Sequence, residues 1–291
     1  MTEITQEQQK KFMDNASNAT FFYTIPVFYP ENPFDPEIGS GTLAIIGGMK
    51  GVITNDHVAD FFKLKKHTYI YTMHPNTTRL DLRFKSIIAL PHKEGGDDVD
   101  LAFIVLDINA CNALISIGKQ FWDLDKSFSE YSPSILDATS SVWLIHGNVD
   151  EGKKTINDPN VEGREILFYE MAGAYFAAPN LNNIERTVCN YGALKFDIDL
   201  INCPRDTKFN YLLPRSFLGM SGGALWKVKL SLEGDIQKID FVGIATEQRP
   251  KIDPHDNNKR KQAKKIICRG PITLYESFYP FCLKELKKFQ D

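Results

Sequence analysis

The sequence predicts an all-β protein in two domains, with a short helix near each end of the chain. Short segments rich in β-branched and aromatic residues alternate with turns of glycine, proline and asparagine along most of the chain. Apolar residues at helical spacing occur close to the two termini. The 291 residues are also enough for two medium-sized domains, each with its own hydrophobic core.

The N-terminal part carries a helix and a first set of strands. Residues from about Thr5 to Asn15 predict a short helix, which we expect to cap the first domain. Thr20 to Tyr29 follows as a strand, and Gly39 to Ile46 and Val52 to Thr54 predict two strands joined by a glycine turn. Further short strands are expected at Tyr69–Thr72 and Leu82–Phe84.

The C-terminal part carries a second set of strands. The stretch from Cys111 to about Asp137 mixes aromatic with polar residues and is expected to cross between the domains. Beyond about Tyr275, apolar residues recur at helical spacing with lysines between them, which predicts a C-terminal helix. We therefore expect an N-terminal domain of residues 1–130 and a C-terminal domain of residues 131–291. The expected strands of the second set are 141–146, 165–170, 174–177, 192–201, 223–228 and 239–245.

Composition narrows the class of protein. The formal net charge is −3 and hydrophobic residues make up 43% of the chain, which is typical of soluble globular proteins and gives no electrostatic support for nucleic-acid binding. The N-terminus is polar where a signal peptide has an apolar core, and no apolar run is long enough to span a membrane. The five cysteines are scattered and lack a Cys-x-x-Cys pair. This favours free thiols in a reducing, cytoplasmic compartment and argues against a structural zinc.

The stretch Gly219-Met220-Ser221-Gly222-Gly223 carries the strongest chemical signal. A serine between glycines suits a nucleophile, because main-chain N–H groups without neighbouring Cβ atoms can approach the oxyanion of an acyl substrate. Taken alone, the stretch is explained equally well as a tight turn.

Two further stretches fit the same chemistry. Thr54-Asn55-Asp56-His57-Val58 ends an apolar strand in a histidine, and Asp100 precedes the apolar run Leu101-Ala102-Phe103-Ile104. The chain order His57, Asp100, Ser221 in these three contexts resembles the chymotrypsin/trypsin-like serine protease family, in its bacterial type. The resemblance covers the chain from about Gly39 to about Glu247.

This resemblance implies a chymotrypsin-like double β-barrel, with His57 and Asp100 on the first barrel and Ser221 on the second. It implies a serine endopeptidase in which His57 acts as general base and Asp100 orients the imidazole. The backbone N–H groups of Gly219 and Ser221 would form the oxyanion hole. The family needs neither a metal nor a cofactor, and its C-terminal helix packs on the second barrel.

Each triad residue also has a structural explanation when it is taken alone. A lone histidine is more often structural than catalytic, and Asp100 is explained equally well as a strand-start acid that binds main-chain N–H groups. Asp97 and Asp98 are neighbouring alternatives. We choose Asp100 because an apolar run follows it directly and would bury its carboxylate against the imidazole.

The chain departs from the digestive members of the family in two ways. Position 220 is Met where those members have an acid, and there is no internal Ile-Val-Gly-Gly sequence to be released by cleavage. Activation by a new N-terminal ammonium group that pairs with that acid is therefore excluded. The site is either preformed or switched on by another route.

The specificity pocket is expected near Arg215, which lies six residues before the nucleophile and in the family occupies the base of the S1 pocket. A guanidinium there would favour an acidic P1 side chain, unless it is paired with a neighbouring acid or turned to solvent. The pocket wall would contain Thr246, expected to hydrogen-bond Asp100, and Glu247. Glu247 and Arg249 have opposite charges and leave the preference open.

The sequence thus predicts a cytoplasmic serine endopeptidase acting on a protein or peptide, without metal, cofactor, nucleic acid or membrane. We expect narrow specificity or a regulatory partner, because an indiscriminate protease would damage its own cell. Two alternatives remain open: a catalytically silent binding or scaffold protein of the same fold, and an esterase-like hydrolase with the same triad.

Overall fold

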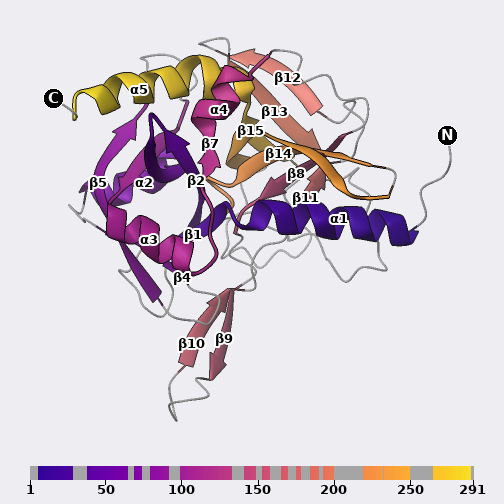
Figure 1. The fold of residues 1–291 in the computed structure, drawn as a ribbon, viewed down its shortest axis with the longest axis horizontal. Helices are drawn as coiled ribbons and strands as arrows, with labels where there is room; N and C mark the ends of the chain where they lie inside the picture. Colours follow the sequence, from indigo (N-terminus) through magenta and orange to yellow (C-terminus); the bar gives the residue numbers. More distant parts are fainter. Residues whose placement is uncertain are drawn as a thin grey trace.

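The structure is a computed structural model. It describes residues 6–28, 38–64, 69–73, 79–91, 99–132, 141–148, 153–157, 165–169, 175–177, 184–189, 193–199, 219–231, 233–249 and 265–289. Two seven-stranded sheets form the body of the molecule, the first from the N-terminal part of the chain and the second from the C-terminal part (Figure 1). The expected all-β, double-barrel class is confirmed.

The first sheet closes on itself. Its strand order is β1-β4-β5-β6-β3-β2, and β1 also pairs with β2, so six antiparallel strands form a barrel. A short strand β7 (Trp122–Asp123) adds to β2 in parallel. The six barrel strands are β1 (Thr24–Phe28), β2 (Ile38–Ile46), β3 (Met49–Thr54), β4 (Tyr69–Met73), β5 (Arg79–Ala89) and β6 (Ala102–Leu106).

A tight turn joins β2 to β3, as the sequence predicts. Gly47 and Gly48 both have positive φ angles, 57° and 73°, which suits two glycines in a hairpin turn. Their N–H groups donate to the carboxylate of Asp125, at 2.7 and 2.9 Å. The hairpin is therefore stabilised by Asp125 as well as by the pairing of its own strands.

Strand β6 is buried along its whole length, which explains its continuous apolar sequence. Ala102, Ile104 and Leu106 belong to the core inside the first barrel. The alternate residues Phe103 and Val105 belong to a second core, which continues to Trp226 in the second sheet. Asp100 therefore lies just before a strand that is packed on both faces.

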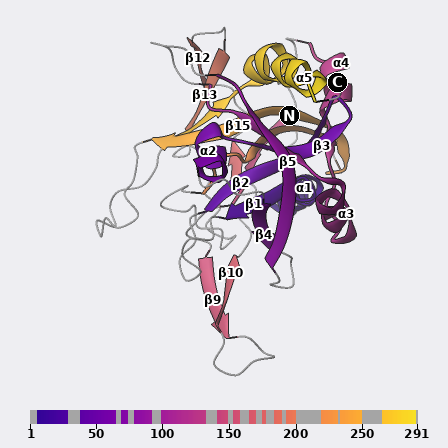
Figure 2. The same cartoon turned by 90° about the vertical axis from the view of Figure 1, so that its left-hand side faces the viewer.

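The second sheet has the order β11-β8-β14-β15-β16-β13-β12. The strand expected at 165–170 is present as β10 (Glu165–Tyr169), but its expected place in the second set of strands is wrong. It pairs with β9 (Lys153–Asn157) in a separate hairpin, which projects away from both sheets (Figures 1 and 2). The seven strands of the sheet are β8 (Ser141–His146), β11 (Tyr175–Ala177), β12 (Ile184–Cys189), β13 (Ala193–Asp199), β14 (Ala224–Leu230), β15 (Ile236–Arg249) and β16 (Lys265–Arg269).

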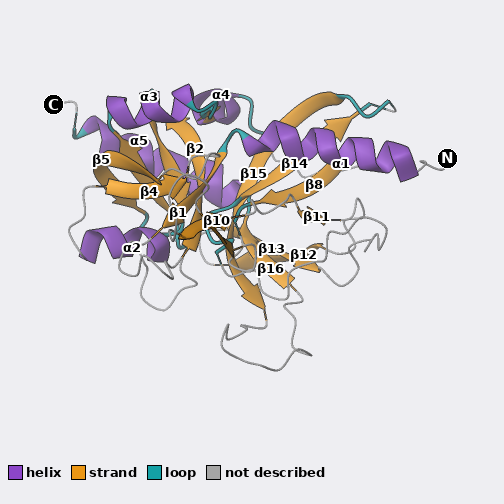
Figure 3. Ribbon diagram, turned by 90° about the horizontal axis from the view of Figure 1, so that it is seen from below, coloured by secondary structure: helices purple, strands orange, loops and turns teal. Residues whose placement is uncertain are grey.

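The helices lie around the outside of the strands (Figure 3). Helix α2 (Asp56–Leu64) follows β3 directly. The crossover between the sheets contains α3 (Ile108–Ser116) and α4 (Leu124–Ser129). The side chains of Asp107 and Asp123 accept hydrogen bonds from N–H groups in the first turns of these two helices, which explains where they begin.

The N-terminal helix corrects two expectations. Helix α1 (Gln6–Phe21) is longer than predicted, and it contacts the second sheet rather than capping the first. Asn15 donates to the Gly234 carbonyl in the β14–β15 turn, and the hydroxyl of Thr20 lies 2.8 Å from Nδ1 of His146 on β8. An amphipathic pattern shows that one face of a helix is buried, but not which partner buries it.

The C-terminal helix packs against both sheets. A π-helical segment, η5 (Ile272–Phe278), contacts the second sheet, where the hydroxyl of Tyr275 donates to the carbonyl of Phe241. Helix α5 (Tyr279–Lys287) continues to the first barrel, where Leu283 lies against the β2–β3 turn. The expectation that this helix packs on the second barrel therefore holds for η5 and is wrong for α5.

Candidate active site

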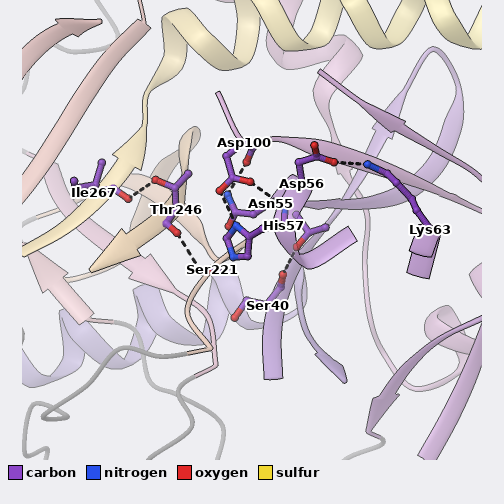
Figure 4. Close-up of polar contacts among 10 residues, drawn as sticks. Ser40, Asn55, Asp56, His57, Lys63, Asp100, Ser221, Thr246 and Ile267 are labelled. Atoms are coloured by element: carbon purple, nitrogen blue, oxygen red, sulfur yellow. Dashed lines mark hydrogen bonds and ion pairs between the residues drawn. The ribbon is translucent and has the colours of Figure 1, made fainter. Parts of the chain in front are cut away.

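His57 lies in the first turn of α2, close to the end of β3 (Figure 4). The carbonyl of Asn55 accepts a hydrogen bond from the N–H of Ala59 at 3.0 Å, so the helix begins immediately after the strand. The side chain of His57 is 54% exposed. An accessible imidazole therefore follows a strand whose last four residues are buried.

Asp100 holds His57 through both carboxylate oxygens. Oδ2 lies 2.7 Å from Nδ1 of the ring, and Oδ1 accepts the backbone N–H of His57 at 3.0 Å. An ionised carboxylate only accepts hydrogen bonds, so Nδ1 carries the proton and Nε2 has a free lone pair. The expectation that the Asp100 carboxylate meets the imidazole is met, with its side chain 20% exposed.

The backbone of Asp100 is unusual. Its φ is +50°, the left-handed region, which is uncommon for a residue other than glycine but better tolerated by Asp and Asn than by most residues. Asn55 donates from Nδ2 to the carbonyl of Asp100 at 2.8 Å. This bond ties the start of β6 to the end of β3. Asn55 is fully buried and is a site residue that the motif analysis did not single out.

Neighbouring charges act on the base. Burial lowers the pKa of His57, but the hydrogen bond and charge of Asp100, together with the charges of Asp56 and Asp60, outweigh it and leave the pKa raised above its ordinary value. Lys63 pairs with both Asp56 and Asp60 on α2. The imidazole is thus a stronger base than a free histidine.

Ser221 lies in a turn that requires glycine after it. The N–H of Gly223 donates to the carbonyl of Met220 at 2.8 Å, which closes the turn around Ser221 and Gly222. Gly222 has a φ of 91°, and a Cβ atom there would overlap the Ser40 carbonyl and the Thr54 hydroxyl oxygen. The first glycine after the serine is therefore required by both conformation and space.

The first barrel contacts this turn directly. The N–H of Ser40, on β2, donates to the carbonyl of Ser221 at 2.7 Å, and the hydroxyl of Thr42 donates to the carbonyl of Gly222 at 3.1 Å. A Cβ atom on Gly39 would lie 2.9 Å from Cγ1 of Val58 and 3.7 Å from the carbonyl oxygen of Ser221. The serine turn is thus next to the start of α2, where His57 lies.

The hydroxyl of Ser221 donates to the carbonyl of Thr246, on β15, at 3.1 Å. Between the described residues His57 and Ser221 there is no hydrogen bond. The proton of the hydroxyl therefore points toward the carbonyl of Thr246 on the second sheet and not toward His57.

Two main-chain N–H groups around Ser221 have no hydrogen-bond partner among the described residues. Gly219 has a φ of 89°, and among the hydrogen bonds between described residues none uses the N–H of Gly219 or of Ser221. Met220, between them, is buried, with its sulfur against Gly147. An apolar contact therefore occupies the position where digestive members of the resembled family have an acid.

The pocket residues are only partly brought to this site. The expected hydrogen bond between Thr246 and Asp100 is wrong, because the Thr246 hydroxyl donates to the carbonyl of Ile267 on β16, at 3.1 Å. Glu247 follows on the same strand and is half-buried. Arg215 and the side chain of Arg249 lie outside the described residues, as do the alternative acids Asp97 and Asp98.

Among the described residues no group of three or more His, Cys, Asp or Glu side chains is placed to hold a metal ion. No helix there is both long and apolar enough to cross a membrane.

No protein-family model and no curated protein matches this chain. Among solved structures, the chain is similar to the active form of the Rv3671c protease from M. tuberculosis, with 11% sequence identity and a TM-score of 0.38. The match covers 89% of this chain and 80% of that one. At this level of similarity the comparison carries no argument about activity. The fold class rests on strand topology, and the candidate site rests on its own geometry.

Proposed function

We propose that this protein is a serine endopeptidase that hydrolyses peptide bonds with Ser221, His57 and Asp100. The observation that carries the proposal is that the His57–Asp100 pair of the first barrel lies next to the Ser221 turn of the second sheet. Asp100 binds both the ring and the main chain of His57 on the first barrel, and a glycine turn of the second sheet brings Ser221 beside them.

The proposed acylation step uses the lone pair on Nε2 of His57. Oγ of Ser221 attacks the carbonyl carbon of the scissile peptide bond, and its proton moves to Nε2. The imidazolium then donates this proton to the leaving amine as the C–N bond breaks, which leaves an acyl-enzyme. Water then attacks the acyl carbon while His57 takes its proton, and the carboxylic acid product leaves as the proton returns to Oγ of Ser221. Asp100 stabilises the imidazolium throughout.

The N–H groups of Gly219 and Ser221 are the proposed oxyanion donors. Both are without a partner among the described residues, and Gly219 carries no side chain that would block a substrate oxygen. Loss of one such donor typically costs roughly 3 kcal/mol of transition-state stabilisation. Substrate binding would also have to break the bond between Ser221 and the Thr246 carbonyl.

The proposed substrate is more specific than peptide bonds in general. We propose a protein or peptide substrate, with Arg215 selecting an acidic P1 side chain, and a partner or a restricted pocket that limits indiscriminate cleavage. We also keep residues 1–130 and 131–291 as the proposed domains. The thiols of Cys111 and Cys282 are free and buried, which supports a reducing, cytoplasmic setting.

One observation favours a second candidate function. Because Ser221 donates to Thr246 and not to His57, the resting geometry also suits a protein that kept the fold for binding and does not turn over. This alternative predicts an unreactive serine.

Labelling with a fluorophosphonate probe near neutral pH tests both candidate functions, the endopeptidase and the silent binding protein. The probe is expected to label the wild type but not Ser221→Ala or His57→Ala. Ser129→Ala is a matched control, because Ser129 is an exposed serine on α4 and its loss is expected to leave labelling unchanged. An unreactive wild type, alone and in cell lysate, would favour the silent binding protein.

A peptide library then separates the remaining possibilities. Cleavage after acidic residues, lost in Arg215→Ala, would support the proposed pocket. Turnover of p-nitrophenyl acetate without cleavage of any peptide would point to the esterase-like alternative.

A further inference from the structure

Ser40 is a polar residue in the middle of a buried strand, and it has no exposed surface. Each of its polar atoms has a partner. Its N–H donates to the Ser221 carbonyl at 2.7 Å, and its carbonyl accepts from the Thr54 hydroxyl at 2.7 Å. Its side chain makes two more hydrogen bonds, both to the main chain of the second half of the molecule.

The direction of the Ser40 hydroxyl proton follows from these two bonds. Oγ lies 2.7 Å from the N–H of Asn148, which can only donate, and 2.8 Å from the carbonyl of Gly219, which can only accept. The hydroxyl therefore accepts from Asn148 and donates to Gly219. One side chain joins the segment after β8 to the serine turn.

The two carbonyls held by Ser40 belong to Gly219 and Ser221, the residues whose N–H groups are the proposed oxyanion donors. Gly219 is the freer of the two, because glycine lacks the steric limits that keep a peptide unit from rotating. A hydrogen bond to its carbonyl restricts that rotation. Ser40 thus restrains both residues from the opposite barrel.

The side chain between the two proposed donors is apolar. Met220, between the two donors, is buried and apolar, so its side chain cannot form an ion pair that would hold the turn in place. The Ser40 hydroxyl is a buried polar contact that holds Gly219, and its loss would leave a main-chain donor and a main-chain acceptor unpaired.

We propose that Ser40 is a positioning residue for the oxyanion hole: its hydroxyl, supplied by the first barrel, holds Gly219 so that the N–H groups of Gly219 and Ser221 converge on the substrate oxygen. The inference rests on the proposed hydrolase function. It adds a role in transition-state stabilisation for a residue outside the triad.

The test compares a variant that removes the side-chain hydrogen bonds of Ser40 with a variant that removes only the hydrogen bond to its main-chain carbonyl. Ser40→Ala removes the hydroxyl and its bonds to Gly219 and Asn148. Thr54→Val removes the bond to the Ser40 carbonyl and keeps the hydroxyl, so it is the matched control for a merely structural contribution. Both residues are fully buried, and both variants are expected to lower the melting temperature.

For Ser40→Ala we expect the rate constant of fluorophosphonate labelling and kcat for p-nitrophenyl acetate to fall roughly 10- to 100-fold, with KM changed much less. Inhibition by phenylboronic acid, which forms a tetrahedral adduct with the serine, should weaken by a similar factor. Thr54→Val should keep all three values within about threefold of wild type. The amide resonance of Gly219 should shift in Ser40→Ala, which is a readout independent of activity.

The outcomes separate the two proposals. An unreactive wild type overturns the proposed function itself. A reactive wild type with Ser40→Ala as active as Thr54→Val overturns the role of Ser40 and leaves the triad standing. If Ser40→Ala does not fold, Ser40→Cys keeps the shape with a weaker hydrogen-bonding group, and a kcat and boronate affinity equal to wild type would then overturn the inference.

Discussion

Replacing Asp100 by Asn tests how the base is oriented. The side chains have the same shape, and Asn tolerates the left-handed backbone conformation of this position (φ +50°). The carboxylate accepts two hydrogen bonds from His57, from the ring and from the backbone N–H. An amide has only one oxygen, so it can accept only one of them.

The backbone N–H of His57 decides how the amide is oriented. This N–H can only donate, so the amide oxygen must face it, and the amide NH₂ then faces Nδ1. Nδ1 becomes an acceptor, and the ring proton moves to Nε2. His57 in this tautomer cannot take the proton of Ser221. We expect kcat to fall about 10³- to 10⁴-fold, which corresponds to roughly 4–5.5 kcal/mol.

The titration of His57 should move in a defined direction. In the wild type, burial lowers the pKa, and Asp100, Asp56 and Asp60 raise it more. Asp100→Asn removes the largest of the raising causes, so the pKa of His57 should fall. The protonated fraction of His57 at a given acidic pH should therefore be smaller in the variant than in the wild type.

The assay combines p-nitrophenyl acetate hydrolysis between pH 5 and 9 with an NMR titration of the His57 ring, and circular dichroism confirms the fold of the variant. A variant that retains activity within tenfold of wild type would refute the tautomer argument. A His57 pKa that stays unchanged or rises would refute the account of its electrostatics.

Three further predictions concern stability. Gly222→Ala should lower the free energy of unfolding in urea by at least about 3 kcal/mol, because the new Cβ overlaps Ser40 and the alanine has to keep a positive φ. Gly48→Ala also has a positive φ but open space around its Cβ, so it should cost about 1 kcal/mol, and equal losses in the two variants would contradict the steric argument. His146 is buried with its pKa lowered to about 3 by burial and by the charge of Lys119, so the unfolded state binds an extra proton below the ordinary pKa of about 6.5. Stability should fall as the pH drops from about 6.5 toward 3, by up to ~1.4 kcal/mol per pH unit, and His146→Gln should flatten this slope in melting curves. Asp125→Ala should lose about 2–3 kcal/mol in urea unfolding, because its carboxylate accepts from the β2–β3 turn and from Tyr279 of α5; an unchanged midpoint would show that α5 docks without it.

The local features of the candidate site follow from the sequence alone. The glycine hairpin of β2 and β3, the burial of β6 and the turn around Ser221 depend on neighbouring residues, and they were predicted correctly because backbone conformation and strand burial leave local patterns. The apolar run after Asp100 favours this acid in the same way, and its carboxylate lies against the ring of His57.

Only the tertiary structure decides which partners those local elements meet. Helix α1 lies on the second sheet and α5 reaches the first barrel, although their sequences show only that each has a buried face. Thr246 donates to Ile267, which lies 21 residues further along the chain on β16, and not to Asp100. Ser40 and Asn55 contact residues 179 and 45 positions away, respectively. The Asn55 bond depends on the pairing of β3 with β6 inside the first barrel, and the Ser40 bond depends on how the two sheets pack. A buried serine or asparagine carries no local pattern that identifies such a partner.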